Sequence, residues 1–276
     1  CSNRTFSNAI AAASASIIKS PRRNENVHCP RIAELSMQPQ QLLPGLFTLV
    51  SQKRVNVFLI VGDDAVTLID TGFPGSADEI LGAVADCGRR PEDVADILLT
   101  HCHNDHAGSA AELQTRTGAT CRMHSLDAQL ARQGRTMRPV TPTLLGHVFY
   151  RAFLKGKPLE QFDIPPVTVD REIQDSEELD VAGGIDAIHI PGHCAGQLAF
   201  LWRRHGGVLF AADAAANAFG LGLSPVYEDL QTGRASLAKL SGLEFEHACF
   251  GHGRAILGGA ARKFRRKWPA PSAAVR

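Results

Sequence analysis

Residues Thr100–Gly108 read Thr-His-Cys-His-Asn-Asp-His-Ala-Gly and place three histidines and one aspartate within six positions, from His101 to His106. Imidazole nitrogens and carboxylate oxygens are ordinary zinc ligands, and imidazole also binds iron, nickel and copper. The alternative is a polar loop whose histidines face solvent. The density of ligand-type side chains makes a metal site the preferred interpretation.

The histidine-rich stretch is predicted to lie in a loop between a strand and a helix. Residues 94–99 form a mostly apolar run that suits a buried strand, and the residues after the stretch have a helix-forming composition. Side chains two positions apart on extended backbone point the same way, so His101 and His103 can converge on one ion. Asp105 and His106 follow where the chain turns into the helix, so they can face a second ion.

The pattern His-x-His-x-Asp-His resembles the signature of the metallo-β-lactamase superfamily, and the resemblance covers about residues 42–257. Four further motifs match the family's ligand motifs in order: Asp70-Thr71-Gly72, Pro191-Gly192-His193, Asp213 after an apolar strand, and Gly251-His252-Gly253. None of the family's ligands is lost, which argues against a non-catalytic binding protein on a decayed hydrolase fold.

This resemblance implies a site for two divalent metal ions. The implied ligands are His101, His103 and His193 for one ion, Asp105, His106 and His252 for the other, and Asp213 as a bridge between them. Zinc is the expected metal, with iron or manganese as alternatives. Asp105 and Asp213 are expected to take part in catalysis. Asp70 is expected to orient the ligand loop by hydrogen bonding, the alternative being an ordinary turn residue.

The implied activity is that of a binuclear hydrolase of the glyoxalase II-like group, in which a hydroxide shared by both ions attacks a small ester, thioester or lactone. Residues 214–216 are alanines, whereas acyl-homoserine lactonases carry a catalytic tyrosine shortly after the bridging aspartate. True β-lactamases of the family usually have Cys or Ser near the position of Asp213. Lactonase or β-lactamase-like activity and, as a different class, phosphodiesterase or nuclease activity are the alternatives.

The resemblance implies a four-layer αββα sandwich, whereas periodicity alone predicts only an α/β (α+β) protein. Strands are predicted at 46–50, 55–61, 65–69, 94–99, 119–123, 167–169, 178–181, 187–190, 198–202, 208–211 and 246–250. Helices are predicted at 76–85, 107–113, 126–133 and 229–240.

Residues 135–166 interrupt this alternation, because they contain five prolines around one helical segment. The apolar side chains of that segment are Leu144, Leu145, Val148, Phe149 and Phe153. Their spacing indicates either core packing of an inserted helix or a cap beside the metal site. In the second case the side chains available to a substrate are Tyr150, Arg151, Lys155 and Lys157.

Composition indicates a soluble globular protein, and the resemblance implies a small-molecule substrate. The chain has 276 residues, 44% of them hydrophobic, with a formal net charge of +1. This balance gives no general attraction to nucleic acid, and no apolar run reaches the roughly 18 residues of a membrane-spanning helix. The basic run at 262–267 is interpreted as a solvated helix face. The oligomeric state is left open.

Residues 1–36 are predicted to be a disordered or non-native extension ahead of a hydrolase domain at 37–276, with a processed targeting sequence as the alternative. The seven cysteines are an odd number without regular spacing, which favours a reducing, cytoplasmic location. Cys102 and Cys194 adjoin proposed ligands and are expected to be bystanders. Six other histidines match no ligand motif: His28, His124, His147, His189, His205 and His247.

Overall fold

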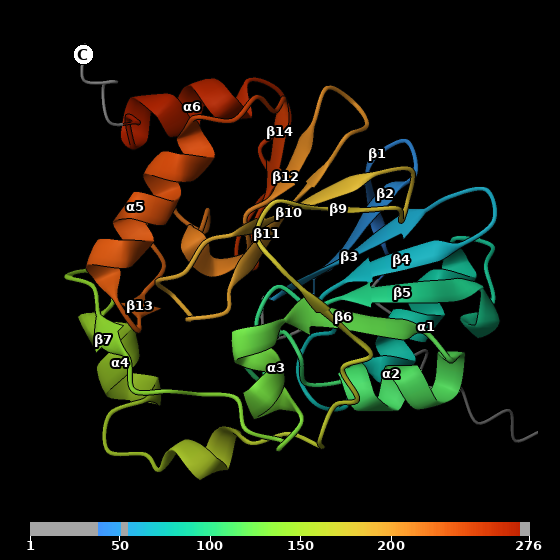
Figure 1. The fold of residues 1–276 in the computed structure, drawn as a ribbon, viewed down its shortest axis with the longest axis horizontal. Helices are drawn as coiled ribbons and strands as arrows, with labels where there is room; N and C mark the ends of the chain where they lie inside the picture. The colour runs from blue at the N-terminus through green and yellow to red at the C-terminus, as the bar shows by residue number, and fades with distance from the viewer. Residues whose placement is uncertain (1–37, 51–54, 271–276) are drawn as a thin grey trace, which may run out of the picture. The chain divides into compact units, whose positions relative to one another are not determined.

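Two mixed β-sheets form the framework of the computed structural model, which describes residues 38–50 and 55–270 (Figure 1). The seven-stranded sheet contains, in spatial order, β1 (Gln40–Leu43), β2 (Leu46–Val50), β3 (Asn56–Val61), β4 (Val66–Ile69), β5 (Val94–Leu98), β6 (Thr120–His124) and β8 (Arg171–Ile173). The five-stranded sheet contains β14 (His247–Cys249), β12 (Val208–Phe210), β11 (Leu198–Trp202), β10 (Ile185–His189) and β9 (Glu177–Leu179).

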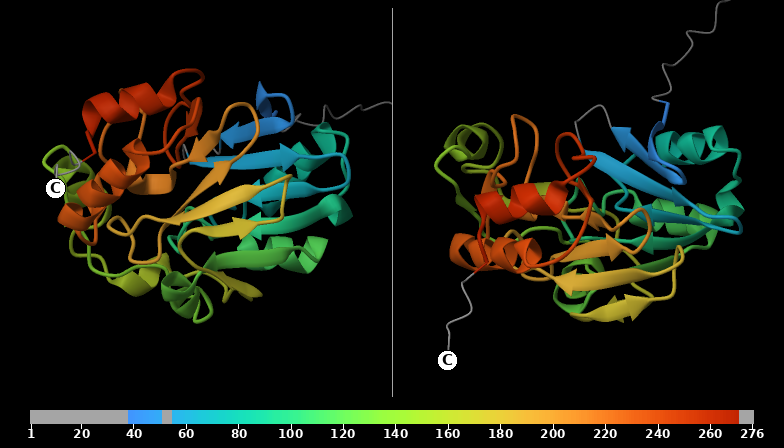
Figure 2. Two further views of the ribbon diagram at one scale, coloured as in Figure 1. Left: turned by 45° about the horizontal axis from the view of Figure 1, so that its top comes forward. Right: turned by 90° about the horizontal axis from the view of Figure 1, so that it is seen from above.

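Helices cover the outer face of each sheet (Figure 2). The helices are α1 (Ala77–Asp86), α2 (Ala110–Thr117), α3 (Ser125–Ala131), α4 (His147–Phe153), α5 (Leu230–Ser241) and α6 (Ala260–Lys267), and three short 3₁₀ turns are η1 (Pro91–Asp93), η2 (Leu159–Phe162) and η3 (Ala212–Ala214). Helices α1 to α3 pack on the first sheet, and α5 and α6 pack on the second.

Three buried apolar layers separate these elements. One lies between the sheets and includes Phe58 and Ile60 of the first sheet with Phe200 and Phe210 of the second. The other two lie between each sheet and its helices. Because both faces of the central strands are covered, a strand such as β3 is buried along almost its whole length. The predicted four-layer αββα sandwich is confirmed.

The strand directions bring the candidate ligands to one edge of the sandwich. Strands β4 and β5 are parallel neighbours, as are β12 and β14. The carboxyl ends of parallel strands lie at the same sheet edge. Each candidate residue lies within three positions of the carboxyl end of one of these strands. They are Asp70 after β4, His101 after β5, Asp213 after β12 and His252 after β14.

Some predicted elements differ from the observed ones. The strand predicted at 167–169 is wrong, because the Val167 N–H bonds to Ala131 at the end of α3 and not to a strand. Helix α2 begins three residues later than predicted, because Gly108 lies in a turn where a Cβ atom would overlap the backbone of Asn104 and Pro74. Strand β1 was not predicted.

The insertion at 135–166 is attached to the second half of the fold by β7 (Thr141–Pro142), which pairs with β13 (Val226–Tyr227). The apolar residues in and just before its helix α4 face outward: Leu144 and Leu145, in the turn before the helix, are 88% and 93% exposed. Val148, Phe149 and Phe153 are also exposed. The core-packing interpretation of this helix is therefore wrong.

The predicted extension at 1–36 lies outside the described residues. Within the part of the chain that the structure describes, no helix is long and apolar enough to cross a membrane. Helix α6 buries Phe264 and exposes its Arg and Lys residues, as the interpretation of a solvated basic face requires.

Candidate metal centre

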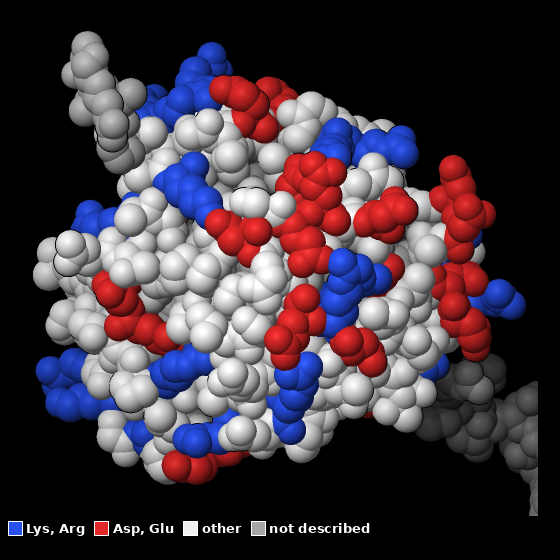
Figure 3. All heavy atoms as spheres, in the orientation of Figure 1, with Lys and Arg blue, Asp and Glu red and all other residues white. Residues whose placement is uncertain are grey.

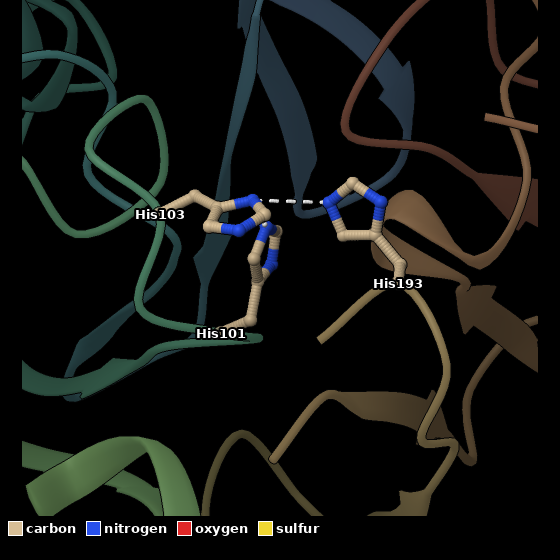
Figure 4. Close-up of side chains that lie close together, drawn as sticks. All are labelled: His101, His103 and His193. Carbon is tan, nitrogen blue, oxygen red and sulfur yellow. Dashed lines mark hydrogen bonds between the residues drawn. The ribbon is translucent and has the colours of Figure 1, made fainter. Parts of the chain in front are cut away.

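Three buried histidines form the first group of candidate ligands (Figure 4). His103 Nδ1 lies 3.1 Å from His101 Nε2 and 3.0 Å from His193 Nε2. An ion with tetrahedral bonds to nitrogen separates its ligand atoms by about 3.3 Å. The three ring nitrogens are therefore spaced as ligands of one ion, as predicted from sequence.

The second group consists of Asp105, His106 and His252. His252 Nε2 lies 3.3 Å from Asp105 Oδ2, and His106 Nε2 lies 3.9 Å from the same oxygen. The side chains of Asp105 and His252 are 21% and 29% exposed, whereas His101 is fully buried. The second group therefore faces solvent, and the first lies behind it.

Asp213 lies between the two groups. Its Oδ2 atom is 3.7 Å from His193 Nε2 and 3.3 Å from His252 Nε2, and its Oδ1 atom is 3.6 Å from His106 Nε2. One carboxylate thus contacts ligand atoms of both groups. All seven predicted ligands converge at one place.

Two buried atoms test whether these residues fit metal ions. His106 Nε2 and Asp213 Oδ1 are buried, and neither has a hydrogen-bond partner in the protein. A buried polar atom without a partner costs free energy. Both atoms face the space between the two groups, where a cation would satisfy them, so the donor set fits divalent metal ions.

Asp70 holds the outer sides of two ligand histidines. Its Oδ2 atom accepts a hydrogen bond from His106 Nδ1 at 2.8 Å. Both of its oxygens accept from the Thr100 hydroxyl, which lies 3.0 Å from His101 Nδ1. Asp70 is 2% exposed and adopts a left-handed backbone conformation, with φ of 63°. This geometry is that of an orienting carboxylate behind metal ligands.

Sequence reasoning missed the partners of the other two histidines. His193 Nδ1 donates to the carbonyl oxygen of Val226 in β13 at 2.8 Å. His103 Nε2 lies 3.4 Å from the Cys194 sulfur. Cys194, expected to be a bystander, therefore contacts a candidate ligand. No sequence motif near Val226 identifies it, because its carbonyl oxygen is available in any residue type.

The three histidines of the first group are uncharged at neutral pH. Burial, together with the neighbouring His193, lowers the pKa of His103 to about 3. Burial likewise lowers the pKa of His101 well below its usual value and also lowers that of His193. Neutral imidazoles keep their lone pairs available, so this group is prepared to bind a cation.

In the second group the histidine pKa values are raised, whereas those of the first group are lowered. Burial alone would lower the pKa of His106, but three surrounding carboxylates, led by Asp105, outweigh it and raise that pKa to about 9. The pKa of His252 is raised in the same way, by Asp213 and Asp105 against the effect of burial. Without a cation, this group therefore holds protons between its carboxylates.

A third cluster, of Cys102, Asp127 and Cys194, also has ligand-type atoms close together. Its carboxylate is already occupied: Asp127 Oδ1 accepts from Arg138 at 2.9 Å and from the Gly196 N–H at 3.0 Å. Burial raises the pKa of the Cys194 thiol well above its usual value. Hydrogen bonds explain this cluster without a metal ion.

The remaining described histidines have partners outside the centre. They bond as follows: His124 with the Leu126 N–H, His147 with Thr143, His189 with Ala195, His205 with Pro44, and His247 with the Gly258 N–H. His28 lies outside the described residues.

Comparisons with known proteins agree with this geometry. Residues 51–252 match the family model described as metallo-beta-lactamase superfamily. The chain is 34% identical over 164 residues to the uncharacterized protein YobT of Bacillus subtilis, which is 58% of this chain and 61% of that protein. It is 29% identical over 196 residues to a hydroxyacylglutathione hydrolase of Xanthomonas axonopodis pv. citri, covering 70% of this chain and 58% of the relative.

A solved structure confirms the fold. BJP-1, a subclass B3 metallo-beta-lactamase of Bradyrhizobium japonicum, aligns with a TM-score of 0.62, at 23% identity over 84% of this chain and 90% of that one. The family match spans most of the sandwich and includes all seven candidate ligands. The chain therefore belongs to the metallo-β-lactamase superfamily.

Proposed function

We propose that this protein is a binuclear metal-dependent hydrolase that cleaves a small ester, thioester or lactone. The observation that carries the proposal is the position of Asp213, whose Oδ2 atom lies within 3.7 Å of His193 and 3.3 Å of His252. A carboxylate between two complete ligand groups is suited to bridge two ions. Nitrogen and oxygen ligands at these spacings favour zinc, and they also suit iron or manganese.

Two divalent ions would supply Lewis acidity toward the substrate's carbonyl oxygen and activate the attacking water. The chain's own residues would bind the ions, orient the ligands and leave a side open to the substrate. The first histidine group offers neutral nitrogens, and Asp70 keeps His101 and His106 oriented. Asp105 and His252 lie on the exposed side, so substrate approaches from there. Asp105 and Asp213 are the carboxylates assigned to catalysis.

The insertion at 135–166 is the proposed cap. Pairing of β7 with β13 places it next to Val226, whose carbonyl oxygen holds His193. Its exposed Leu144, Leu145 and Val148 suit an apolar acyl group. Arg151, Lys155 and Lys157 are exposed on the same segment and suit a carboxylate. The named hydroxyacylglutathione hydrolase activity of one relative supports a thioester among the substrate classes.

The alternatives have less support from the described residues. The hydroxyl of Tyr227 donates to the Ala214 carbonyl oxygen at 2.7 Å, so this tyrosine is engaged within the protein and does not replace the tyrosine of the lactonases. A nuclease needs a basic surface that follows a nucleic acid backbone. On the face shown in Figure 3, basic and acidic side chains are interspersed.

Metal stoichiometry and turnover test the proposal together. Protein reconstituted with zinc, iron or manganese is expected to retain two ions per chain by elemental analysis. Asp213→Ala is expected to abolish turnover of the accepted substrate, whereas Asp64→Ala, in an exposed loop, should leave it unchanged. Substrates to compare are thioesters, lactones, aryl esters, β-lactams and bis-nitrophenyl phosphate. Binding of no metal, or full activity of Asp213→Ala, would refute the proposal.

A further inference from the structure

The ring of His103 is held between the candidate metal position and a thiol. Its Nδ1 atom faces His101 and His193, at 3.1 Å and 3.0 Å. Its Nε2 atom faces the sulfur of Cys194 at 3.4 Å. A neutral imidazole that binds a cation through Nδ1 carries its proton on Nε2. In that tautomer the Nε2–H of His103 donates to the Cys194 sulfur.

The other ligand histidines with described outer contacts use oxygen acceptors. These partners are the Thr100 hydroxyl for His101, the Asp70 carboxylate for His106 and the Val226 carbonyl for His193. Sulfur is a weaker acceptor than oxygen. For His103 the contact therefore orients the ring mainly through the fixed position of the sulfur, because the hydrogen bond itself is weak.

Buried and partly buried charges fix the backbone that carries this sulfur. The Ala195 N–H donates to Glu228 at 2.9 Å, and the Gly196 N–H donates to Asp127 at 3.0 Å. Arg138 contacts both carboxylates, at 3.2 Å and 2.9 Å. The two residues after Cys194 are thus held by an ion-pair network.

The same network reaches the loop that carries His103. The Cys102 N–H donates to Asp127 Oδ2 at 3.2 Å. Asp127 is fully buried, so it joins the two ligand loops where solvent does not compete. The distance between His103 and Cys194 is thereby determined from both sides.

We propose that Cys194 is a positioning residue for His103: its sulfur accepts the Nε2–H, which fixes the tautomer and orientation in which Nδ1 binds the first ion. This inference rests on the proposed metal centre. Outer partners of ligand histidines typically change metal affinity by about 10- to 100-fold. Cys194 therefore sets the affinity of the first ion without contacting it.

Three variants of the full chain test this role by competition with a chelating dye for zinc. Cys194→Ala is expected to weaken binding of the first ion by about 10- to 100-fold. Cys194→Ser keeps an acceptor and is expected to restore most of that loss. Cys121→Ala is the matched control, since it removes an equally buried thiol in β6 that belongs to none of the candidate metal-binding clusters among the described residues.

A second readout separates positioning from simple packing. Cys194→Ala and Cys121→Ala should lower the melting temperature of the metal-free protein similarly, while only Cys194→Ala weakens zinc binding. Equal zinc affinity in the two alanine variants would overturn the proposal. So would a sulfur-to-metal charge-transfer band in the cobalt-substituted wild type that disappears in Cys194→Ser, because Cys194 would then be a ligand.

The wild type also reports on the proposal, so the test does not depend on folding of the variants. Nitrogen-15 NMR of histidine-labelled, zinc-loaded protein is expected to show His103 protonated at Nε2, and protonation at Nδ1 would contradict the inference. If the wild type binds no zinc, the proposed function itself fails. If it binds two ions and the variants do not differ, only the role of Cys194 fails.

Discussion

Gly251 lies directly against two candidate ligands, Asp213 and His106. A Cβ atom at this position would overlap Asp213 Oδ1 and lie 2.6 Å from His106 Cε1. Only a hydrogen atom fits there, so the glycine that precedes His252 leaves room for the ligands to meet.

Gly251→Ala is therefore expected to remove the second ion, because the added methyl group displaces Asp213 and His106. Elemental analysis should find about one zinc per chain, with turnover reduced at least about 100-fold. Gly82→Ala is the control. A Cβ atom at this exposed position of α1 meets nothing within 4 Å, so alanine should stabilise the helix by about 1 kcal/mol. Two retained ions in Gly251→Ala would contradict this steric account.

Asp70 supports the ligands from behind, and its removal should weaken both sites. Asp70→Asn supplies one amide group in place of an acceptor that receives bonds from Thr100 and His106. Zinc affinity is expected to fall by about 10- to 100-fold, as judged by chelator competition. Asp64→Asn, in an exposed loop, is the control and should bind zinc as the wild type does. Unchanged affinity in Asp70→Asn would indicate an ordinary turn residue.

At this scale the sequence predicted which residues converge and the supporting position of Asp70, but not the outer partners of His103 and His193. The spacing of His101, His103 and His106 is local, so a short motif reveals it. The partners of the histidines are determined by folding: Cys194 lies 91 positions from His103, and Val226 lies 33 from His193. A thiol or a backbone carbonyl has no distinctive sequence pattern, so these contacts could be found only in three dimensions.

Among the elements, α4 departs furthest from its predicted environment. Its apolar spacing allows either burial or contact with a ligand, and periodicity cannot distinguish the two. The N-terminal end of the helix lies against the residue before β13, since a Cβ atom on Gly146 would overlap the Pro225 carbonyl group. The apolar side chains Val148 and Phe153 are exposed. The exposed apolar face is what makes the insertion a candidate cap.

The cap should affect substrate binding more than catalysis. Leu145→Ser is expected to raise KM for a long-chain acyl substrate by about three- to tenfold while kcat stays within about twofold, because one apolar contact is lost outside the metal centre. Thermal stability should not change, since Leu145 is 93% exposed. Leu257→Ser, which lies just before α6 and is 50% exposed, serves as the control. Equal KM values in both variants would exclude Leu145 from substrate contact.

The strand wrongly predicted at 167–169 illustrates a limit of pattern reading. Val167 and Val169 are buried and Thr168 is exposed, which is the alternation of a half-buried strand. The segment instead packs beside α3 and α2, where Thr168 accepts a hydrogen bond from Gln114. Alternation reports which side chains are buried, and it does not report where the backbone hydrogen bonds go.

Across the whole molecule, both halves of the sandwich contribute residues to each ligand group at one edge, and the two groups differ in electrostatic character. The first group is neutral because it is buried, whereas the second is protonated because Asp105 and Asp213 surround its histidines. A cation entering the second group must displace protons, and one entering the first does not.

Binding of the second ion should therefore depend on pH. The pKa of His106 is raised to about 9, so its protonated form dominates below that pH and competes with the metal. Affinity for the second ion is expected to rise as pH increases from 6 to about 9, while affinity for the first changes little above pH 6.5. Calorimetry in buffers of different ionisation enthalpy should find proton release mainly with the second ion. Equal proton release for both ions would contradict this asymmetry.

The central claim is that Asp213 lies between two cations. Anomalous diffraction at the zinc edge from crystals of the zinc-loaded protein tests it most directly. We expect two peaks about 3.5–4 Å apart, as in other two-metal sites, one beside His101, His103 and His193 and one beside Asp105, His106 and His252, with the Asp213 carboxylate in contact with both. A single peak, or two peaks that Asp213 does not join, would contradict the account.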